Sequence, residues 1–430
     1  MKILVIAIGS RGDVNPFLAL ALKLLRKGHE VVFCGSENYR KMIEGLGLRF
    51  IPHSTRQEYE AVTQDQDLWH YRKAMPTYIK KGLLPLVRRI YPLIVQERTK
   101  DFLVVAPLFA TAAKLAEEVS GIKLVQLHLA PSMFRSLQDT AQIGAVSMSH
   151  QWPAWYKKLV WWIADSFFID PCMKKELNSF RRELGLKPVS RILHTWMFSS
   201  CLNAAVFSRS IGQQQPDWPM PSEVFDFFLY DGDEQVPPEA VDFLSRGAPP
   251  IVFTFGTAFR FGKRDFEKSV TALELLGARG IFLTSKQEDI PDRLPETIRA
   301  FPFLPLGKIL PSCRAIVHHG GIGTLGQALK AGVPQLIRPM AYDQFDNAYR
   351  ITTRKLGDYI LARQYKAGRL HQKLGAILDD KEIAANCREV AGHIDSEKAL
   401  NALIRRIEEL GACGEHVSQT SADRQQRAGA

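Results

Sequence analysis

Apolar positions in the first half of the chain form short runs that alternate with stretches of helical spacing. Residues 3–8 are a continuous apolar run, and residues 16–27 repeat Leu and Ala at the spacing of an amphipathic helix. Two further apolar runs follow at residues 102–107 and 122–130. Strands that are apolar on both faces and separated by helices are typical of a parallel sheet covered on both sides. We therefore expect a doubly wound α/β domain over residues 1–210.

The pattern changes between residues 131 and 200. Long helical stretches rich in aromatic side chains replace the short strands, and four of the seven tryptophans lie between Trp152 and Trp162. This change predicts a helical and aromatic insertion in the first domain. Residues 211–239 are rich in Pro and Asp and break the periodicity, so we expect a linker there.

Alternating strands and helices return after the linker. Apolar runs recur in the segments PIVFTFG, GIFLT and DYILA, and three helical stretches close the pattern near Leu410. This predicts a second doubly wound domain over residues 240–412. Residues 413–430 are polar and without pattern, and we expect them to be disordered.

Residues 314–347 contain the most informative motif, HHGGIGT, placed between a buried strand and a helix. Glycines let a backbone approach a ligand closely, and the first amides of a helix favour an anion. Gly321, Gly323 and Gly326 also have the GxGxxG spacing of a nicotinamide coenzyme site, with Asp343 after the next strand. A histidine directly before the glycines favours a different anionic ligand, because His319 can donate a hydrogen bond to a phosphate.

Asp13 lies just past the first strand, where open parallel sheets place their ligands. A free aspartate has a pKa of about 3.9, so its carboxylate can accept a proton from an attacking hydroxyl at neutral pH. The alternative is that Asp13 caps the helix predicted to begin near Pro16. The two roles are compatible.

Composition narrows the class of protein. The net charge of +11 suits an anionic ligand or surface, but Lys and Arg are dispersed and predict no nucleic-acid site. The six cysteines have no metal-like or disulfide-like spacing, which favours a reduced, cytoplasmic protein. The first apolar run is too short for a signal peptide, and the chain has no apolar stretch of the ~18 residues that a membrane span requires. The DxD triplets at 65–67 and 231–233 follow no suitable strand, so we expect no metal and no cofactor.

The motif HGGxGT followed by PQLIRPMAYDQ resembles the donor signature of the family 1 nucleotide-sugar glycosyltransferases, and GSRGDVNPFLALALKL resembles the N-terminal motif of their sterol and glycopeptide members. Longer segments, among them RRELGLKPVSRILHTWM and QQPDWPMP, are similar to the rhamnosyltransferases of rhamnolipid synthesis and their bacterial relatives. The resemblance covers nearly all of residues 1–410. It implies the GT-B architecture, in which two Rossmann-like domains face a cleft.

The resemblance also implies roles for particular residues. Asp13 would be the catalytic base. The family's WxPQ segment appears here as FLPL, which leaves the base contacts and the sugar preference open. The donor would contact Ser10, Gly256, Thr257, Phe303, Leu304, His319, Gly321, Gly323, Thr324, Asp343 and Gln344.

The implied reaction is an inverting, metal-independent transfer of a hexose from dTDP-rhamnose or a UDP-sugar to the hydroxyl of a hydrophobic, lipid-like acceptor. For the acceptor we expect contacts with Trp152, Trp155 and Phe134. A sterol, hopanoid or natural-product glucosyltransferase, an inactive GT-B auxiliary subunit and an NAD(P)-binding protein are the alternatives. The basic residues Lys80, Lys81, Arg88 and Arg89 frame an apolar helix, a pattern that would suit peripheral contact with the inner membrane surface.

Overall fold

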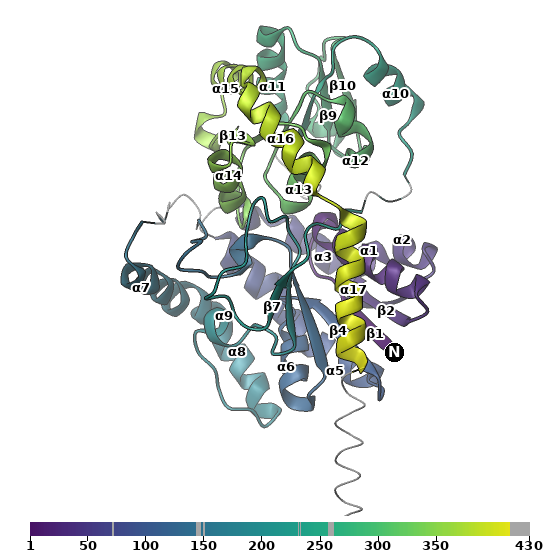
Figure 1. The fold of residues 1–430 in the computed structure, drawn as a ribbon, viewed down its shortest axis with the longest axis vertical. Coiled ribbons are helices and arrows are strands. Elements are labelled where there is room, and N and C mark those ends of the chain that lie inside the picture. The colour runs from purple at the N-terminus through teal and green to yellow at the C-terminus, as the bar shows by residue number, and fades with distance from the viewer. Residues whose placement is uncertain are drawn as a thin grey trace, which may run out of the picture.

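The computed structural model describes residues 1–70, 73–142, 148, 151–230, 232, 234–256 and 262–412. They form two α/β domains that lie one above the other in Figure 1, with the N-terminal domain below. Each domain is built around one parallel sheet. The expected fold class of two doubly wound parallel sheets is confirmed.

The sheet of the first domain has the strand order β3-β2-β1-β4-β5-β6-β7, and all its neighbours are parallel. Its strands are β1 (Lys2–Ile6), β2 (Glu30–Ser36), β3 (Arg49–Ser54), β4 (Phe102–Pro107), β5 (Lys123–His128), β6 (Leu202–Ala205) and β7 (Ser222–Val224). Its helical segments are α1 (Arg11–Arg26), α2 (Arg40–Gly45), α3 (Arg56–Thr63), α4 (Ala74–Thr77), α5 (Leu84–Glu97), α6 (Thr111–Ser120), α7 (Ala154–Ala164), α8 (Asp170–Glu183) and α9 (Ile192–Thr195), with π-helical turns η3 (Tyr78–Leu83) and η5 (Asp165–Ile169).

The sheet of the second domain has the order β10-β9-β8-β11-β12-β13 and is also parallel. Its strands are β8 (Ile251–Thr254), β9 (Gly280–Leu283), β10 (Ile298–Phe301), β11 (Ala315–His318), β12 (Gln335–Ile337) and β13 (Gly357–Tyr359). The helices of this half of the chain are α10 (Pro238–Ser245), α11 (Lys263–Leu276), α12 (Leu306–Ile309), α13 (Ile322–Ala331), α14 (Gln344–Thr353), α15 (Ala367–Asp379), α16 (Lys381–His393) and α17 (Ser396–Ala412).

The surroundings of strand β1 explain why apolar and polar residues do not alternate in its sequence. Ile3 and Val5 point into a core shared with α1 and α17, whereas Leu4 and Ile6 point into a core shared with α5, α6 and α8. All four side chains are fully buried. A strand covered by helices on both faces has no solvent side, so the period of two does not appear in its sequence.

Two domain boundaries differ from the expected ones. Strand β7 lies within the segment expected to be a linker and extends the first sheet beside β6. Helix α17 lies within the range expected for the second domain, but Leu403, Ile404 and Ile407 pack into the core of the first domain. Figure 1 shows α17, in yellow, leaving the second domain and lying along the first. The chain thus crosses between the domains twice, and the segment 413–430 lies outside the described residues.

Helix α1 begins at Arg11 rather than near Pro16, because Ser10 and Asp13 form a capping box at its N-terminus. Asp13 therefore belongs to the first helical turn. In both domains the loops that carry the sequence motifs leave the carboxyl ends of the central strands β1 and β11, the ends at which open parallel sheets bind ligands.

Candidate active site

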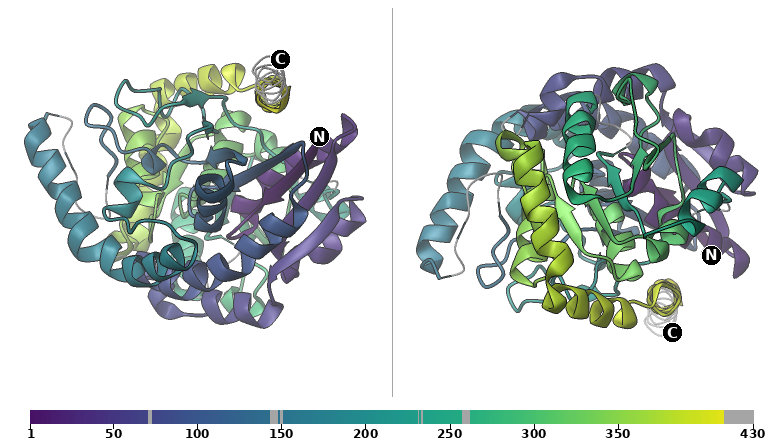
Figure 2. Two further views of the ribbon diagram at one scale, coloured as in Figure 1. Left: turned by 90° about the horizontal axis from the view of Figure 1, so that it is seen from below. Right: turned by 90° about the horizontal axis from the view of Figure 1, so that it is seen from above.

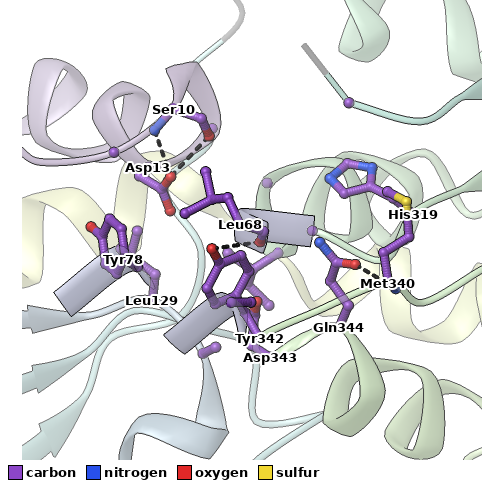
Figure 3. Close-up of a pocket in the computed structure, with 18 of the residues that line it drawn as sticks. Ser10, Asp13, Leu68, Tyr78, Leu129, His319, Met340, Tyr342, Asp343 and Gln344 are labelled. Carbon is purple, nitrogen blue, oxygen red and sulfur yellow. Dashed lines mark hydrogen bonds between the residues drawn. The ribbon is translucent and has the colours of Figure 1, made fainter. Parts of the chain in front are cut away.

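Asp13 lies on the first turn of α1, at the wall of a cavity between the domains (Figure 3). Its Oδ2 accepts hydrogen bonds from the Ser10 amide and from the Ser10 hydroxyl, each at 2.8 Å. A Cβ on Gly9, whose φ is +128°, would lie 2.5 Å from the same oxygen, so the turn requires glycine there. Both bonds use Oδ2, which leaves Oδ1 as the oxygen available to a ligand. Asp13 caps the helix and lines the cavity at once.

The surroundings of Asp13 favour proton uptake. Burial raises the pKa of its carboxyl above the usual value, against the effect of the Ser10 hydrogen bonds. A poorly solvated carboxylate is a better proton acceptor than one exposed to water. Burial raises the pKa values of four tyrosines near the cavity, and the charge of Asp13 raises them further: Tyr39, Tyr59, Tyr78 and Tyr342.

His319 follows β11 and is held between two glycines. A Cβ on Gly321 would lie 2.4 Å from His319 Nε2, and one on Gly256 would lie 3.1 Å from the same atom. Neither glycine can carry a side chain while the imidazole stays in this position. The preceding His318 is fully buried and bonds Gln335 at 2.9 Å, so it is part of the fold rather than of the cavity wall.

The His319 ring is neutral at pH 7 in the ligand-free protein. Burial lowers its pKa to about 4, although a hydrogen bond to the Thr254 backbone acts in the opposite direction. Its buried Nδ1 has no hydrogen-bond partner among the described residues. A buried polar atom without a partner is costly. His319 therefore lines the cavity with one buried ring nitrogen left unsatisfied.

Helix α13 begins at Ile322 with Gly321 as its N-cap, and its first turn carries Gly323 and Thr324 into the cavity wall. A Cβ on Gly323 would lie 3.4 Å from Gly12 Cα on α1. The N-termini of α1 and α13 thus meet across the domain boundary. Unpaired amides and the helix dipole make each N-terminus attractive to negative charge, and here two of them lie together.

The loop after β12 brings Asp343 and Gln344 to the same cavity. Gln344 Oε1 accepts hydrogen bonds from the amides of Met340 and Ala341 at 2.8 and 3.1 Å, so its NH₂ group is the part left for a ligand. Asp343 Oδ2 accepts a hydrogen bond from Asn347 at 2.8 Å. Burial, followed by the charge of Asp13, raises the pKa of Asp343 to about 7. The two carboxyl groups therefore interact electrostatically across the cavity.

Phe303 and Leu304, also expected at the donor, differ in how far their side chains are exposed. Phe303 is partly exposed, and the guanidinium of Arg11 lies 4.6 Å from its ring centre while pairing with Glu234. The side chain of Leu304 is buried in the core, so only its backbone is available to a ligand. Thr257 lies outside the described residues.

One cavity of about 2070 Å³ unites these groups and extends into the first domain. Apart from Leu304, whose contribution is confined to its backbone, the described residues expected at the donor line it, together with Asp13. The part that reaches into the first domain, called here the acceptor arm, is lined by Leu86, Met133, Val160, Trp161, Ile169 and Leu193.

The three residues expected at the acceptor do not line this cavity. Phe134 is 1% exposed and stacks on Trp218 with ring centres 4.0 Å apart, which makes it part of the core. Trp155 is 67% exposed and packs edge-on against Tyr156, as does Trp152. The structure instead brings Trp161 and Met133 to the cavity. The aromatic insertion contributes Trp161 to the cavity wall, but the helical register that turns Trp161 inward is set by packing.

Tyr342 is a cavity residue that no pattern in the sequence singles out, although it lies inside the second-domain motif. Its hydroxyl donates to the Leu68 carbonyl of the first domain at 2.9 Å, and its ring meets Tyr78 edge-on at 6.1 Å (Figure 3). Its φ of 57° is unusual for a bulky residue. Tyr342 thus ties the loop that carries Asp343 to the opposite domain.

Two protein-family models and several known proteins match this chain. Residues 3–82 match the N-terminal domain of glycosyltransferase family 28, and residues 279–410 match the erythromycin biosynthesis protein CIII-like C-terminal domain. The chain is 27% identical over 438 residues to O-mycaminosyltylonolide 6-deoxyallosyltransferase of Streptomyces fradiae, covering 95% of this chain and 97% of that protein. The protein is a family 1 glycosyltransferase with the GT-B fold.

Two further proteins place this glycosyltransferase within the group. Sterol 3-beta-glucosyltransferase UGT80B1 of Arabidopsis thaliana is 24% identical to it over 422 residues, which cover 94% of this chain and 67% of the plant protein. The structure of the glycosyltransferase VinC in complex with dTDP superposes with a TM-score of 0.66 at 19% identity, covering 97% of this chain and all of VinC. As a member of this family, the glycosyltransferase uses a nucleotide-sugar donor.

Two structural findings complete the description of the glycosyltransferase. Within the described residues, no group of three or more His, Cys, Asp or Glu side chains is arranged to hold a metal ion. No helix among those residues is both long and apolar enough to cross a bilayer.

Proposed function

We propose that this glycosyltransferase transfers a hexose, with inversion at the anomeric carbon, from a dTDP- or UDP-sugar to the hydroxyl of a lipid-like acceptor. The observation that carries the proposal is the geometry of one cavity. Asp13, a carboxylate in an environment that favours proton uptake, and the anion-binding N-terminus of α13 with His319 line the same space from different domains. An inverting displacement requires a base and a leaving-group site on opposite sides of the reacting carbon.

In the proposed reaction Asp13 Oδ1 takes the proton of the acceptor hydroxyl. The hydroxyl oxygen forms a bond to the anomeric carbon while the bond from that carbon to the diphosphate oxygen breaks. The proton ends on Asp13 and the negative charge on the departing nucleotide diphosphate. The amides at the α13 N-terminus, Thr324 and His319 stabilise that charge as it develops.

Contacts on the donor side support the remaining assignments. Phe303 offers an aromatic face to the nucleotide base, with Arg11 stacked on the same ring. The NH₂ group of Gln344 and the carboxyl of Asp343 suit sugar hydroxyls, which both donate and accept hydrogen bonds. The solved complex of the similar protein VinC with dTDP favours a thymidine nucleotide, and among such donors we propose dTDP-rhamnose.

The acceptor arm supports a largely apolar acceptor. Its walls are Leu, Met, Val, Ile and Trp side chains, and the cavity has room for a molecule much larger than a free sugar. The name of one relative includes a modified tylonolide and that of another a sterol. We favour a glycolipid-forming, rhamnolipid-type reaction. A sterol, hopanoid or natural-product glucosyltransferase is the second candidate, which the sterol glucosyltransferase relative supports. A lipid acceptor also implies peripheral contact with a membrane.

A donor panel tests this proposal. Thermal unfolding is followed with UDP-glucose, UDP-GlcNAc, dTDP-glucose and dTDP-rhamnose, since a ligand at 100 times its dissociation constant stabilises a protein by about 2.7 kcal/mol. The selected donor is then incubated with a hydroxy fatty acid, a sterol and a macrolide aglycone, and release of nucleotide diphosphate is measured. We expect dTDP-rhamnose to give the largest shift and the fatty acid the fastest release. A UDP-glucose and sterol pair would replace the first candidate by the second.

A further inference from the structure

Helix α7 and the π-helical turn η5 together have two apolar faces. One face belongs to the cavity, since Val160, Trp161 and Ile169 line the acceptor arm. In Figures 1 and 2 the segment lies at the outer edge of the first domain, away from α17 and from the second domain. The same short element therefore separates the acceptor arm from the surroundings of the protein.

The other face of this segment is apolar and exposed. Trp155 is 67% exposed, Trp162 45% and Phe167 64%. Of the fourteen large apolar side chains that are exposed in the described part of the chain, seven lie between Trp155 and Phe168. Single exposed apolar residues are ordinary, but a contiguous group on one element marks an interaction surface. We call this group, Trp155, Tyr156, Leu159, Trp162, Ile163, Phe167 and Phe168, the aromatic face.

Within residues 152–169 the one exposed charged side chain is positive. Residues 152–169 contain one carboxylate, Asp165, which is fully buried and bonds Arg135 at 2.6 Å. Lys158 on α7 is exposed. Lys80 is also exposed, and it lies close enough to Cys172 to affect the pKa of that thiol, while Cys172 in turn contacts the Phe168 carbonyl. The aromatic face thus combines exposed aromatic side chains with exposed lysines, for which the described residues show no ion pair.

Three of the four basic residues that the sequence suggested for a membrane face are paired with carboxylates. Arg88 forms a bidentate pair with Glu183, and Arg89 forms one with Glu58. Lys81 pairs with Asp65. Carboxylates therefore compensate most of the charge on that surface, whereas the aromatic face has none of its own exposed.

We propose that the aromatic face of α7 and η5 docks on an anionic lipid bilayer and admits the acceptor to the cavity directly from it. The surface has the features of an interfacial helix, with Trp and Phe on one side and Lys at its edge. It is continuous through Ile163 and Phe168 with the residues that line the cavity. The proposal rests on the lipid-like acceptor proposed above and adds the place at which that lipid enters.

The test is co-sedimentation of the full-length protein with vesicles of phosphatidylcholine alone and with 30% phosphatidylglycerol. The variant Trp155→Gln/Trp162→Gln/Phe167→Gln removes three side chains that do not line the cavity, and Gln preserves helix propensity. The matched control, Val95→Gln/Val241→Gln/Leu275→Gln, removes three exposed apolar side chains from other helices. Circular dichroism and size-exclusion chromatography accompany each variant.

We expect the wild type and the control to bind the anionic vesicles, and the aromatic-face variant to bind at least about tenfold more weakly while remaining folded. Equal binding by all three proteins, or no binding by the wild type, would overturn the proposal. A wild-type dimer that the variant converts to a monomer would also overturn it, because the face would then bind a second copy. Vesicle binding requires no donor, so failure of the transferase reaction would leave this result intact.

Discussion

The donor side and the acceptor side of the cavity are built in different ways. On the donor side, Gly256, His319 and Gly321 follow strand ends directly, and their positions are fixed by local backbone geometry. On the acceptor side, Leu86, Met133 and Leu193 come from separate helical segments and meet only through packing. A site made by a glycine turn is visible in consecutive residues. A site made by the packing of distant segments is not.

Asp13 belongs to the acceptor side and should give the largest effect. Asp13→Asn keeps the shape of the side chain and its ability to accept the Ser10 hydrogen bonds, but it removes the base. We expect kcat to fall about a hundredfold to ten-thousandfold, the usual contribution of a positioned general base. Affinity for the donor, measured by calorimetry, should change little.

A control separates capping from catalysis. Glu58 is the matching residue of the capping box at α3, which accepts from the Thr55 amide. Glu58→Ala and Asp13→Ala each remove the carboxylate of one capping box, and the free energies of unfolding of the two variants report what each cap contributes to stability. Normal turnover in Asp13→Asn would assign Asp13 to the fold alone.

His319 tests the donor side. Burial holds the pKa of the His319 ring at about 4, and we expect a bound diphosphate to raise that pKa, so donor affinity should rise as pH falls from 8 to 6. His319→Gln fits the same space but cannot become cationic. We expect kcat/KM to fall about tenfold to a hundredfold and the pH dependence of donor affinity to flatten.

Calorimetry in buffers of different ionisation enthalpy measures that proton uptake. A nucleotide sugar is used rather than a free diphosphate, whose terminal phosphate titrates in the same range. Equal heats in all buffers, with wild-type affinity that ignores pH, would mean that His319 contacts the donor without taking a proton.

Tyr342 joins the two sides and should give a smaller effect. Tyr342→Phe removes only the hydrogen bond to the Leu68 carbonyl, worth about 0.5–1.5 kcal/mol. We expect a roughly twofold to tenfold loss in kcat/KM for the acceptor, with affinity for free nucleotide diphosphate preserved. Tyr359→Phe, on a half-exposed residue of the second domain, is the control. Identical kinetics in both variants would remove Tyr342 from the alignment of the two domains.

Asp343 gives the smallest effect and reports electrostatics across the cavity. Its pKa of about 7 in the folded protein exceeds the ordinary value of about 3.9, so the unfolded chain releases this proton first. The stabilisation of the folded state by the protonated Asp343 carboxyl is fully present below pH 4, and it is lost as the pH rises through 7. Asp343→Asn should therefore melt about 2 °C or more above wild type at pH 8, with little difference at pH 4. A constant difference across pH would contradict the raised pKa.

The electrostatic interaction between Asp13 and Asp343 can also be measured from the other side of the pair. Since the charge of Asp13 helps to raise the pKa of Asp343, Asp13→Asn should lower the pKa of Asp343 below about 7. Carboxyl ¹³C chemical shifts measured against pH report the change.

Much of the fold could be predicted because the central strands β1, β4, β8 and β11 lie in apolar runs between helices. Helix α17 could not be assigned to a domain, since its apolar stripe of Leu403, Ile404 and Ile407 fits either core equally well in sequence. Strand β7 is three residues long, too short for a pattern in a segment rich in proline. The predicted start of α1 lies too late in the chain, because Pro16 is typical of a first helical turn, whereas the capping box of Ser10 and Asp13 starts the helix at Arg11.

The contrast between local turns and tertiary packing also explains which parts of the candidate site could be predicted from the sequence. HHGGIGT identified His319 and the α13 N-terminus because the turn and its ligand groups are adjacent in the chain. The tryptophans of the insertion identified a segment but not its orientation, since only the tertiary structure turns Trp161 inward and Trp155 outward. Tyr342 lay within a motif, yet its partner Leu68 is distant in sequence.

The configuration of the product at the anomeric carbon tests the central proposal most directly. With the donor selected by the panel, the one-bond coupling between carbon 1 and its proton is measured by NMR in the earliest product. Because Asp13 and the α13 N-terminus lie on different walls of the cavity, we predict a product whose anomeric configuration is opposite to that of the donor. A product with the donor's own configuration would contradict direct displacement with Asp13 as the base.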